Sequence, residues 1–283
     1  MTELRWQRPV DLRRPLVIVA LEGLFDAAGA ATAAVDHLVR HYDAQPVADI
    51  DPEVFFDFTQ ARPVVRLADD GRRVIDWPVT TAHAAVVEDG AHDLVLVRGV
   101  EPHLRWRTFA DALLELAQTT GAEMVITLGA MVGLAPHTRA LGVVGSAADE
   151  AVADRLGLGR PSYEGPTGLV GALHTRLDDA GMPVVSLRVS VPHYVPNPPN
   201  PEATRSLLAR LELITGIVTE HSALDYAADD WRRRIDAVVG DDAELTAYVQ
   251  RLETEVDRSE ILPTGDDIAA ELEAFLRDRR ADD

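Results

Sequence analysis

The sequence has 283 residues, of which 47% are hydrophobic and 26% charged, a balance typical of a globular protein of one large or two modest domains. Its 47 acidic and 27 basic residues give a formal net charge of −20, and such a surface repels phosphate groups, so we expect neither nucleic acid nor an anionic membrane as a partner. The chain has no cysteine and every basic residue is arginine, which excludes disulfides, cysteine-containing zinc sites, lysine Schiff bases and lysine-dependent P-loops.

The first predicted elements are a buried strand and a helix. Residues 16–21 form an uninterrupted apolar run, and apolar residues between 31 and 42 recur at the spacing of one helix face. The apolar run is much shorter than the roughly 20 residues that cross a bilayer, and it is also too short for a secretory signal. We therefore expect a cytoplasmic protein.

The segment between residues 64 and 87 has a different pattern. Three short stretches, 64–67, 74–77 and 83–87, are broken by a turn at 69–71, which predicts a hairpin. We expect this segment to add antiparallel strands at the edge of a sheet.

A complete unit of strand, helix and strand follows. An apolar run at 94–97 leads into helical spacing over 106–117, Gly121 is a helix stop, and a second apolar run occupies 124–128. The alternation of strands and helices predicts the α/β class, with a largely parallel sheet covered by helices on both faces.

Two more helices and a strand are predicted before residue 192. Ser146 and Asp149 resemble a capping box before a short helix, and Thr167 is the expected cap of a helix over 169–177. Residues 184–191 then read as a strand.

A domain boundary is predicted near residue 218. The proline-rich stretch 192–201 is compatible with neither a helix nor a central strand. Residues 219–283 contain 19 acidic residues and 8 arginines, a net charge of −11, and have a helical pattern only. We expect an α/β domain over 1–218 and an acidic helical extension over 219–283.

The extension is expected to contain two amphipathic helices. One apolar stripe runs over 245–256 behind a capping signal of Asp241 and Glu244, and the other runs over 268–276 behind Thr264. Each apolar face needs a partner, either the α/β body and the other helix or a second protein.

Candidate functional residues follow the predicted strands, at the carboxyl ends where open α/β sheets bind ligands. They are Glu22, Gly23, Asp26, Glu101, Gly129, His137, Thr138, Arg139, Tyr163, Glu164, Thr167, His193 and Tyr194. If the sheet is parallel here, these residues line one crevice.

These residues also have simpler interpretations. Asp26 is placed to cap the helix that follows it, which competes with a role in binding a ligand. His137 within reach of Glu164 would be an acid–base pair, but neither His137 nor His193 has a partner at metal-ligand spacing, so no metal site is predicted. The dinucleotide fingerprint and the nucleophile-elbow sequence are both absent, so we predict no cofactor and assign no catalytic residue.

Six sequence motifs, in order from Leu16 to about Gly216, resemble the proteasome assembly chaperone 2 family in its actinobacterial form. They are Glu22-Gly23-x-x-Asp26-Ala27, Gly99-Val-Glu101-Pro102-x-x-Arg105-Trp106-Arg107-x-Phe109, Thr127-Leu-Gly129-Ala130, Pro136-His137-Thr138-Arg139, Tyr163-Glu164-Gly165-Pro166-Thr167-Gly168, and Val191-Pro192-His193-Tyr194-Val195 with Pro198-Pro199-Asn200-Pro201. Asn200, in the last motif, joins the candidate crevice residues.

The resemblance implies a three-layer αβα sandwich similar to the purine nucleoside phosphorylase-like fold, with a C-terminal helical extension. It also implies protein binding rather than catalysis, since eukaryotic members of the family escort proteasome α-subunits. Similarity of fold to phosphorylases does not transfer an active site.

The sequence departs from the family pattern in two places. The usual Gly-Trp-x-Asp-Ala-Gly reads Gly23-Leu24-Phe25-Asp26-Ala27-Ala28, which puts in doubt any role of that tryptophan or second glycine. The sequence ends without the hydrophobic residue, tyrosine and final residue that many proteasome-binding factors insert into α-ring pockets. We therefore do not expect docking through the C-terminus.

Two hypotheses result from the sequence. The first is a non-catalytic chaperone or adaptor that binds protein partners, including proteasome subunits, and forms a homo-oligomer to cover exposed edges and apolar faces. The alternative is a hydrolase or transferase acting on a small molecule. It requires one pocket built from Glu22, Glu101, His137, Arg139, Tyr163, Glu164 and His193.

Overall fold

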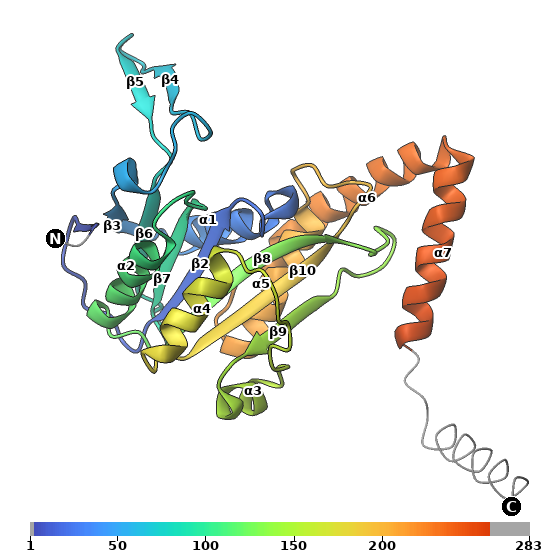
Figure 1. Ribbon diagram of the computed structural model, residues 1–283. Coiled ribbons are helices and arrows are strands. Elements are labelled where there is room, and N and C mark those ends of the chain that lie inside the picture. Colours follow the sequence, from blue (N-terminus) through green and yellow to red (C-terminus); the bar gives the residue numbers. More distant parts are fainter. Residues whose placement is uncertain (1–2, 261–283) are drawn as a thin grey trace, which may run out of the picture. The chain divides into compact units, whose positions relative to one another are not determined.

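The computed structural model describes residues 3–260 (Figure 1). Two units divide the chain, residues 1–235 and residues 236–283. The division predicted at residues 218 and 219 stays a prediction, although the first unit continues beyond it. Within residues 3–260 no helix is both long and apolar enough to span a bilayer.

An eight-stranded sheet forms the centre of the first unit, within the described residues. From one edge to the other its strands are β1 (Leu4–Trp6), β3 (Gln45–Ile50), β6 (Thr80–Ala85), β7 (Leu94–Val100), β2 (Leu16–Glu22), β8 (Met124–Gly133), β10 (Val184–Pro192) and β9 (Val143–Ala147). The four strands β7, β2, β8 and β10 are parallel, and every other neighbouring pair is antiparallel. The carboxyl ends of the parallel strands therefore meet at one edge, as expected from the sequence.

The continuous apolar sequence of β2 results from burial on both faces of the sheet. Leu16, Ile18 and Ala20 belong to one hydrophobic core, and Val17 and Val19 belong to the other. Side chains alternate between faces along a strand, so a strand covered on both sides needs apolar residues at every position.

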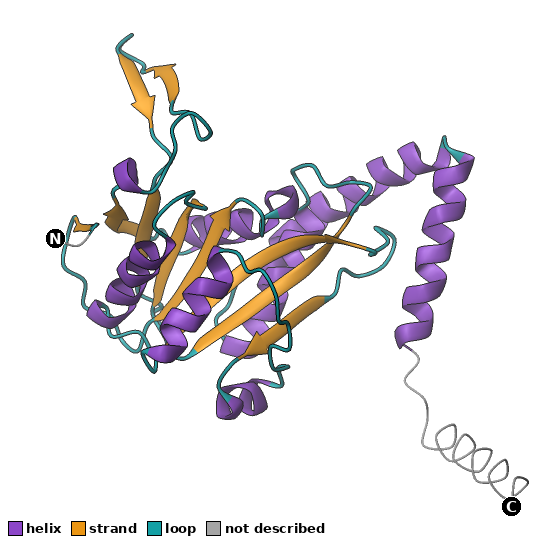
Figure 2. Cartoon of the chain, in the orientation of Figure 1, coloured by secondary structure: helices purple, strands orange, loops and turns teal. Residues whose placement is uncertain are grey.

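Helices cover both faces of the sheet, which confirms the three-layer α/β prediction (Figure 2). One layer contains α1 (Ala30–His41) and α5 (Pro201–Thr215), and the opposite layer contains α2 (Trp106–Thr119) and α4 (Leu169–Asp179). Four shorter helical segments also occur before α6 (Asp225–Gly240): α3 (Glu150–Leu156) near β9 and the 3-10 helices η1 (Ala27–Gly29), η2 (Pro52–Val54) and η3 (His221–Leu224).

The segment 64–87 does not form edge strands of the sheet, so that prediction was wrong. β4 (Val64–Leu67) and β5 (Arg73–Asp76) pair with each other as a separate two-stranded hairpin, which projects from the sheet in Figure 1. β6 is an interior strand, because β3 and β1 extend the sheet beyond it. The hydrophobic pattern does not show these outer strands, since β3 begins with a polar residue and a proline and β1 has three residues.

Helix caps differ in detail from the sequence predictions. The Asp149 carboxylate caps α3 by accepting from the Val152 N–H at 2.8 Å, whereas Ser146 lies in the edge strand β9 and caps nothing. Gly168, not Thr167, is the residue that precedes α4, and it provides no side-chain cap. The proline-rich stretch contains the end of the interior strand β10 at Pro192 and the first residue of α5 at Pro201, where a missing N–H is tolerated.

The extension is helical over its described residues. α6 (Asp225–Gly240) is followed by α7 (Ala243–Glu260), which is capped by Asp242 rather than by the predicted Asp241. The helix predicted behind Thr264 lies outside the described residues.

Candidate functional site

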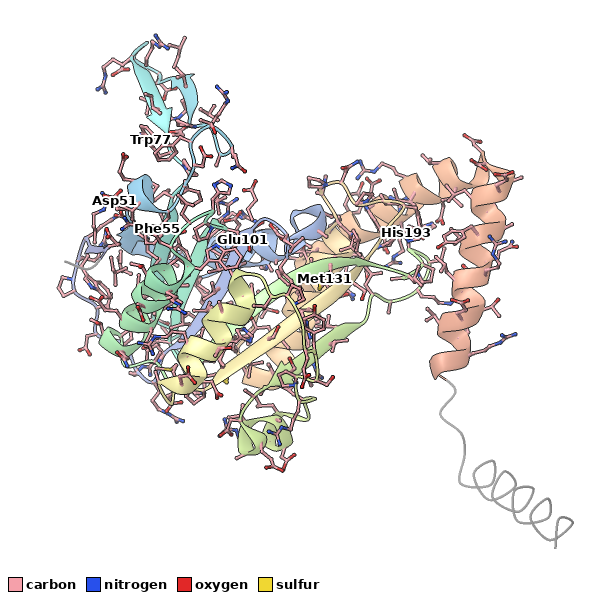
Figure 3. All side chains as sticks on the ribbon, in the orientation of Figure 1. Asp51, Phe55, Trp77, Glu101, Met131 and His193 are labelled. Carbon is pink, nitrogen blue, oxygen red and sulfur yellow. The ribbon has the colours of Figure 1, made fainter. Side chains whose placement is uncertain are left out.

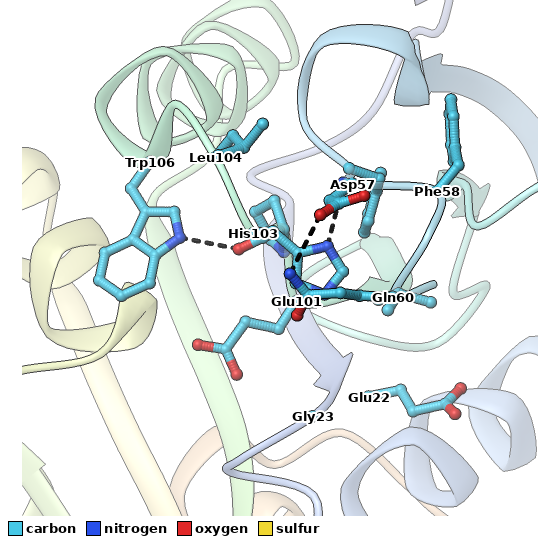
Figure 4. Close-up of a pocket in the computed structure, with 12 residues that line it drawn as sticks. Glu22, Gly23, Asp57, Phe58, Gln60, Glu101, His103, Leu104 and Trp106 are labelled. Atoms are coloured by element: carbon cyan, nitrogen blue, oxygen red, sulfur yellow. Dashed lines mark hydrogen bonds between the residues drawn. The ribbon is translucent and has the colours of Figure 1, made fainter. Parts of the chain in front are cut away.

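A hollow of about 760 Å³ lies at the carboxyl ends of β2 and β7 (Figure 4). Three of the predicted site residues line it: Glu22 and Gly23 after β2, and Glu101 after β7. The other lining groups that matter chemically are Asp57 and His103, together with the aromatic rings of Phe56, Phe58 and Trp106.

Glu101 holds the loop that follows β2. Its backbone N–H donates to the Glu22 carbonyl at 2.8 Å, which extends the parallel pairing by one residue. Its carboxylate oxygen Oε2 accepts from the Leu24 N–H at 3.1 Å. A Cβ at Gly23, where φ is +153°, would lie 2.7 Å from Oε2, so only glycine allows this approach.

The Glu101 carboxylate also lies close to the start of α4. A Cβ at Gly168, the residue before α4, would lie 3.7 Å from Oε1 of Glu101. The partial positive charge at a helix N-terminus favours a carboxylate in this position. Glu101 therefore lies between the β2 loop and the start of α4, on one side of the hollow.

The opposite wall comes from residues 56–60, which the sequence reasoning missed. The Asp57 carboxylate accepts from the Thr59 hydroxyl at 2.7 Å, the Thr59 N–H at 2.9 Å and Gln60 Nε2 at 3.1 Å. These hydrogen bonds, first that of the Thr59 side chain, lower the pKa of Asp57 below its usual value, so it carries a negative charge at neutral pH.

His103 fixes this wall to the end of β7. Its Nδ1 accepts from the Asp57 N–H at 3.2 Å, so the proton of the neutral imidazole sits on Nε2 (Figure 4). The His103 ring also packs edge-on against Phe56, with ring centres 5.8 Å apart. The sequence Asp-x-Thr-Gln at 57–60 is typical of an Asx-type turn, and it is the signal from which this wall could have been predicted.

The hollow combines negative charge with aromatic walls. Glu22, Asp57 and Glu101 supply carboxylates, and Trp106 is held in place because its indole N–H donates to the Pro102 carbonyl at 2.7 Å. Carboxylates together with ring faces are the surroundings that favour an arginine or lysine side chain. The arrangement is therefore suited to receiving a cationic group.

His137 and Tyr194 form a second group, apart from this hollow. His137 is buried, its N–H donates to the Tyr194 hydroxyl at 2.8 Å, and its ring Nδ1 lies 2.7 Å from the same oxygen. Trp231 packs edge-on against the His137 ring, with ring centres 6.5 Å apart. His193 is exposed and its N–H donates to the Gly133 carbonyl at 3.2 Å.

Thr138 and Arg139 continue the turn that contains His137, where the Arg139 N–H donates to the Pro136 carbonyl at 3.3 Å. Gly129 lies inside β8 rather than after it, because β8 continues to Gly133. The Phe25 carbonyl accepts from the Ala130 N–H at 2.7 Å, beside Gly129. Gly129 is therefore a position of close backbone packing.

Two predicted site residues are helix caps. The buried Asp26 carboxylate accepts from the Ala31 N–H at 2.8 Å and the Thr32 hydroxyl at 2.5 Å, in the first turn of α1. Asn200 Oδ1 accepts from the Ala203 N–H at 3.0 Å in the first turn of α5. For Asp26 this is the simpler of the two interpretations offered by the sequence.

Tyr163, Glu164 and Thr167 lie in an exposed loop before α4. The Tyr163 hydroxyl donates to the Pro166 carbonyl at 3.1 Å.

The structure does not bring the predicted site residues together in one crevice. Glu22, Gly23 and Glu101 line the hollow, while the set required by the enzyme hypothesis is not gathered there. Among residues 3–260 no cluster of three histidine or acidic side chains is arranged to hold a metal ion.

Comparison with known proteins gives a family match over most of the chain. The model of the PAC2 family matches residues 20–239. No curated protein matches the chain.

Solved structures match the fold closely. A PAC2 family protein from Streptomyces avermitilis is 42% identical, with a TM-score of 0.78, and the match covers 83% of this chain and 99% of that one. A proteasome-assembly chaperone homologue from Mycobacterium tuberculosis is 39% identical, with a TM-score of 0.75 and the same coverage. PbaB of Pyrococcus furiosus, an archaeal proteasome activator, is 19% identical, with a TM-score of 0.66. The match covers 84% of this chain and 99% of PbaB, so the two proteins share the fold.

Proposed function

The chain belongs to the PAC2 family, and on that premise we propose that it is a non-catalytic protein-binding chaperone or adaptor whose partners are proteasome α-subunits. The M. tuberculosis homologue at 39% identity is described as a proteasome-assembly chaperone homologue, which supports this choice of partner. A cytoplasmic location and a homo-oligomeric state are parts of the same proposal.

The observation that carries the proposal is the exposed apolar face of the β4–β5 hairpin. Val65 pairs with Ile75, and Leu67 lies two residues along on the same face. Their exposed fractions are 47%, 48% and 70%. Arg73, the partner of Leu67, is the one charged residue on this face among the described pairs. The opposite face holds an ion pair between Arg66 and Asp76 at 2.7 Å, beside Val64 and Val74.

An apolar face of this kind is unusual on a projecting hairpin. A two-stranded hairpin is marginally stable by itself in water, and burial of its apolar face against another protein would stabilise it. Each of the three aliphatic side chains would contribute on the order of 1 kcal/mol when buried. We infer that the hairpin is a docking element for a protein partner.

The hairpin and the hollow form one continuous surface. Trp77 lies at the base of the hairpin (Figure 3). Its ring packs edge-on against Phe58, with ring centres 4.8 Å apart. Phe58 lines the hollow beside Asp57. The chemistry of this surface fits a partner that presents an apolar patch next to an arginine or lysine side chain.

The test is binding of purified proteasome α-subunits from the same cells to the intact protein and to hairpin variants. Leu67→Ser combined with Ile75→Ser is expected to weaken binding at least tenfold, because it removes apolar area from the docking face. Val64→Ser is the matched control, since Val64 is 63% exposed on the opposite face of the same hairpin.

Two results would contradict the proposal. One is failure of the intact protein to bind any α-subunit, together with unchanged proteasome assembly in cells that lack it. The other is equal loss of binding in the control and the double variant, which would show that the apolar face of the hairpin is not the docking surface.

A further inference from the structure

The hollow at the ends of β2 and β7 lies at a switch point of the sheet. β2 and β7 are parallel neighbours, but β2 leads into α1 on one face and β7 leads into α2 on the other. Open α/β sheets bind small molecules at such points, in the crevice outside the carboxyl ends of the strands. The volume of the hollow, about 760 Å³, is also within the usual range for small-molecule sites, about 300–1,000 Å³.

The hollow carries a negative charge that nothing in its walls balances. Glu22, Asp57 and Glu101 line it, and no arginine is among its lining residues, all of which lie in the described part of the chain. The donors that reach the carboxylates of Asp57 and Glu101 are neutral hydroxyl, amide and backbone groups, so they leave the charges in place. A ligand that balances this charge must be cationic.

The three carboxylates do not converge on one point. They come from the end of β2, the loop of residues 56–60 and the residue after β7, and Figure 4 shows them on different sides of the hollow. Within residues 3–260 no three acidic or histidine side chains are grouped to hold a metal ion. The negative charge is thus spread over a volume, which suits a ligand with positive charges at separate positions.

The walls between the carboxylates are apolar. Phe58 and Trp106 are half-buried, and Leu104 is 51% exposed. Methylene groups pack well against such side chains, and the faces of aromatic rings also attract ammonium groups. A hydrocarbon chain with an ammonium group at each end matches both the walls and the spread of charge.

We propose that the hollow binds an aliphatic diamine or polyamine. Its ammonium groups pair with the three carboxylates, and its methylene chain packs against Phe58 and Trp106. The site itself does not depend on the proposed adaptor function. Its consequence for docking does rest on that function, because a polyamine in the hollow keeps out a cationic side chain of the partner.

The tryptophans provide a probe of the site, since the chain has four. Tryptophan is labelled with ¹⁵N, and Trp106→Phe and Trp6→Phe identify the indole signals of these two residues. Trp6 is half-buried in β1 and does not line the hollow, so its signal is the internal control. The intact protein is titrated with putrescine, spermidine, butylamine and magnesium chloride at constant ionic strength.

We expect the Trp106 signal to shift and saturate with putrescine or spermidine, while the Trp6 signal stays in place. Butylamine has the carbon chain of putrescine but one charge, so it should bind roughly fivefold more weakly or less. A Trp106 signal that moves with neither polyamine, or that moves equally with butylamine or magnesium, overturns the proposal.

Three variants separate the hollow from the acidic surface as a whole. Glu22→Gln removes an exposed carboxylate, and Asp57→Asn keeps an oxygen that accepts from Thr59. Each should weaken spermidine binding by roughly threefold or more, measured by calorimetry, with an unchanged circular dichroism spectrum. Asp178→Asn removes the same charge from an exposed position on α4 and should leave the affinity as it is. Equal affinity of the three variants would also overturn the proposal.

Failure of this inference can be told apart from failure of the proposed function. Spermidine binding by a protein that binds no α-subunit would contradict the proposed function and support the polyamine site. Binding of α-subunits by a protein that binds neither polyamine would do the reverse.

Discussion

The carboxylate of Glu101 lies directly against Gly23. It accepts a hydrogen bond from the N–H of the next residue, Leu24, at 3.1 Å, and a Cβ at position 23 would meet its Oε2 at 2.7 Å. The ends of β2 and β7 are thus joined by a side chain that needs a glycine opposite it. This contact shapes the floor of the hollow.

Gly23→Ala should destabilise the protein, by about 1–3 kcal/mol, because alanine is strained at a φ of +153° and its Cβ displaces Glu101. Urea unfolding followed by circular dichroism measures the change. Gly121→Ala is the control, since φ is +69° there and nothing lies within 4 Å of the added Cβ. Equal losses in the two variants would show that the Glu101 contact contributes nothing.

His174 should make the stability depend on pH in the mildly acidic range. Burial, and secondarily the charge of Arg188, lower the pKa of His174 from 6.5 to about 4, and its Nε2 lies 2.8 Å from the Thr127 hydroxyl. Below pH 6.5 the unfolded chain takes up a proton that the folded chain does not. The free energy of unfolding should therefore fall by about 2 kcal/mol between pH 7 and pH 5 through this group.

Denaturant unfolding at several pH values tests this expectation. His174→Gln should flatten the pH dependence between pH 7 and pH 5, because glutamine does not titrate there. His41→Gln, a change at an exposed histidine, should leave the dependence as it is in the intact protein. A pH profile of His174→Gln identical to that of the intact protein would contradict the assignment.

The predicted domain boundary can be tested by truncation. Trp231 is 4% exposed in the first unit, and Arg232 donates to the buried Glu202 carboxylate at 2.9 Å. A chain ending at Thr219 lacks both residues, so it should be less stable than a chain ending at Gly240 by roughly 3 kcal/mol or more. Equal stability of the two truncated chains would support the boundary predicted near residue 218.

The central strands could be predicted from the sequence because both their faces are buried. Leu16–Leu21 is apolar at every position, and a run of this length beside a helical segment is typical of a buried strand. The end of β8 was predicted too early, at Leu128, because Gly129 interrupts the apolar run. Met131 and Val132 beyond it are 42% and 56% exposed and belong to the strand through pairing with β10. Backbone pairing leaves no mark in the hydrophobic pattern.

Part of the candidate site could be predicted because the buried strands, and therefore their carboxyl ends, can be located from the apolar runs in the sequence. Glu22 and Glu101 follow buried strands, so the rule that sites lie at the carboxyl ends of parallel strands identified them. Asp57 and His103 meet through a hydrogen bond between residues 46 positions apart, and residues 56–60 show no periodicity. Contacts of that kind depend on the tertiary fold.

The most direct test of the central claim, that the hairpin docks a proteasome subunit, is site-specific crosslinking in the protein's own cells. A photo-reactive residue replaces Leu67 on the apolar face, or the exposed Asp178 on α4 as the control. We predict a covalent adduct with a proteasome α-subunit from position 67 and none from position 178. No α-subunit adduct from position 67, or an adduct only with a second copy of this chain, would contradict the account.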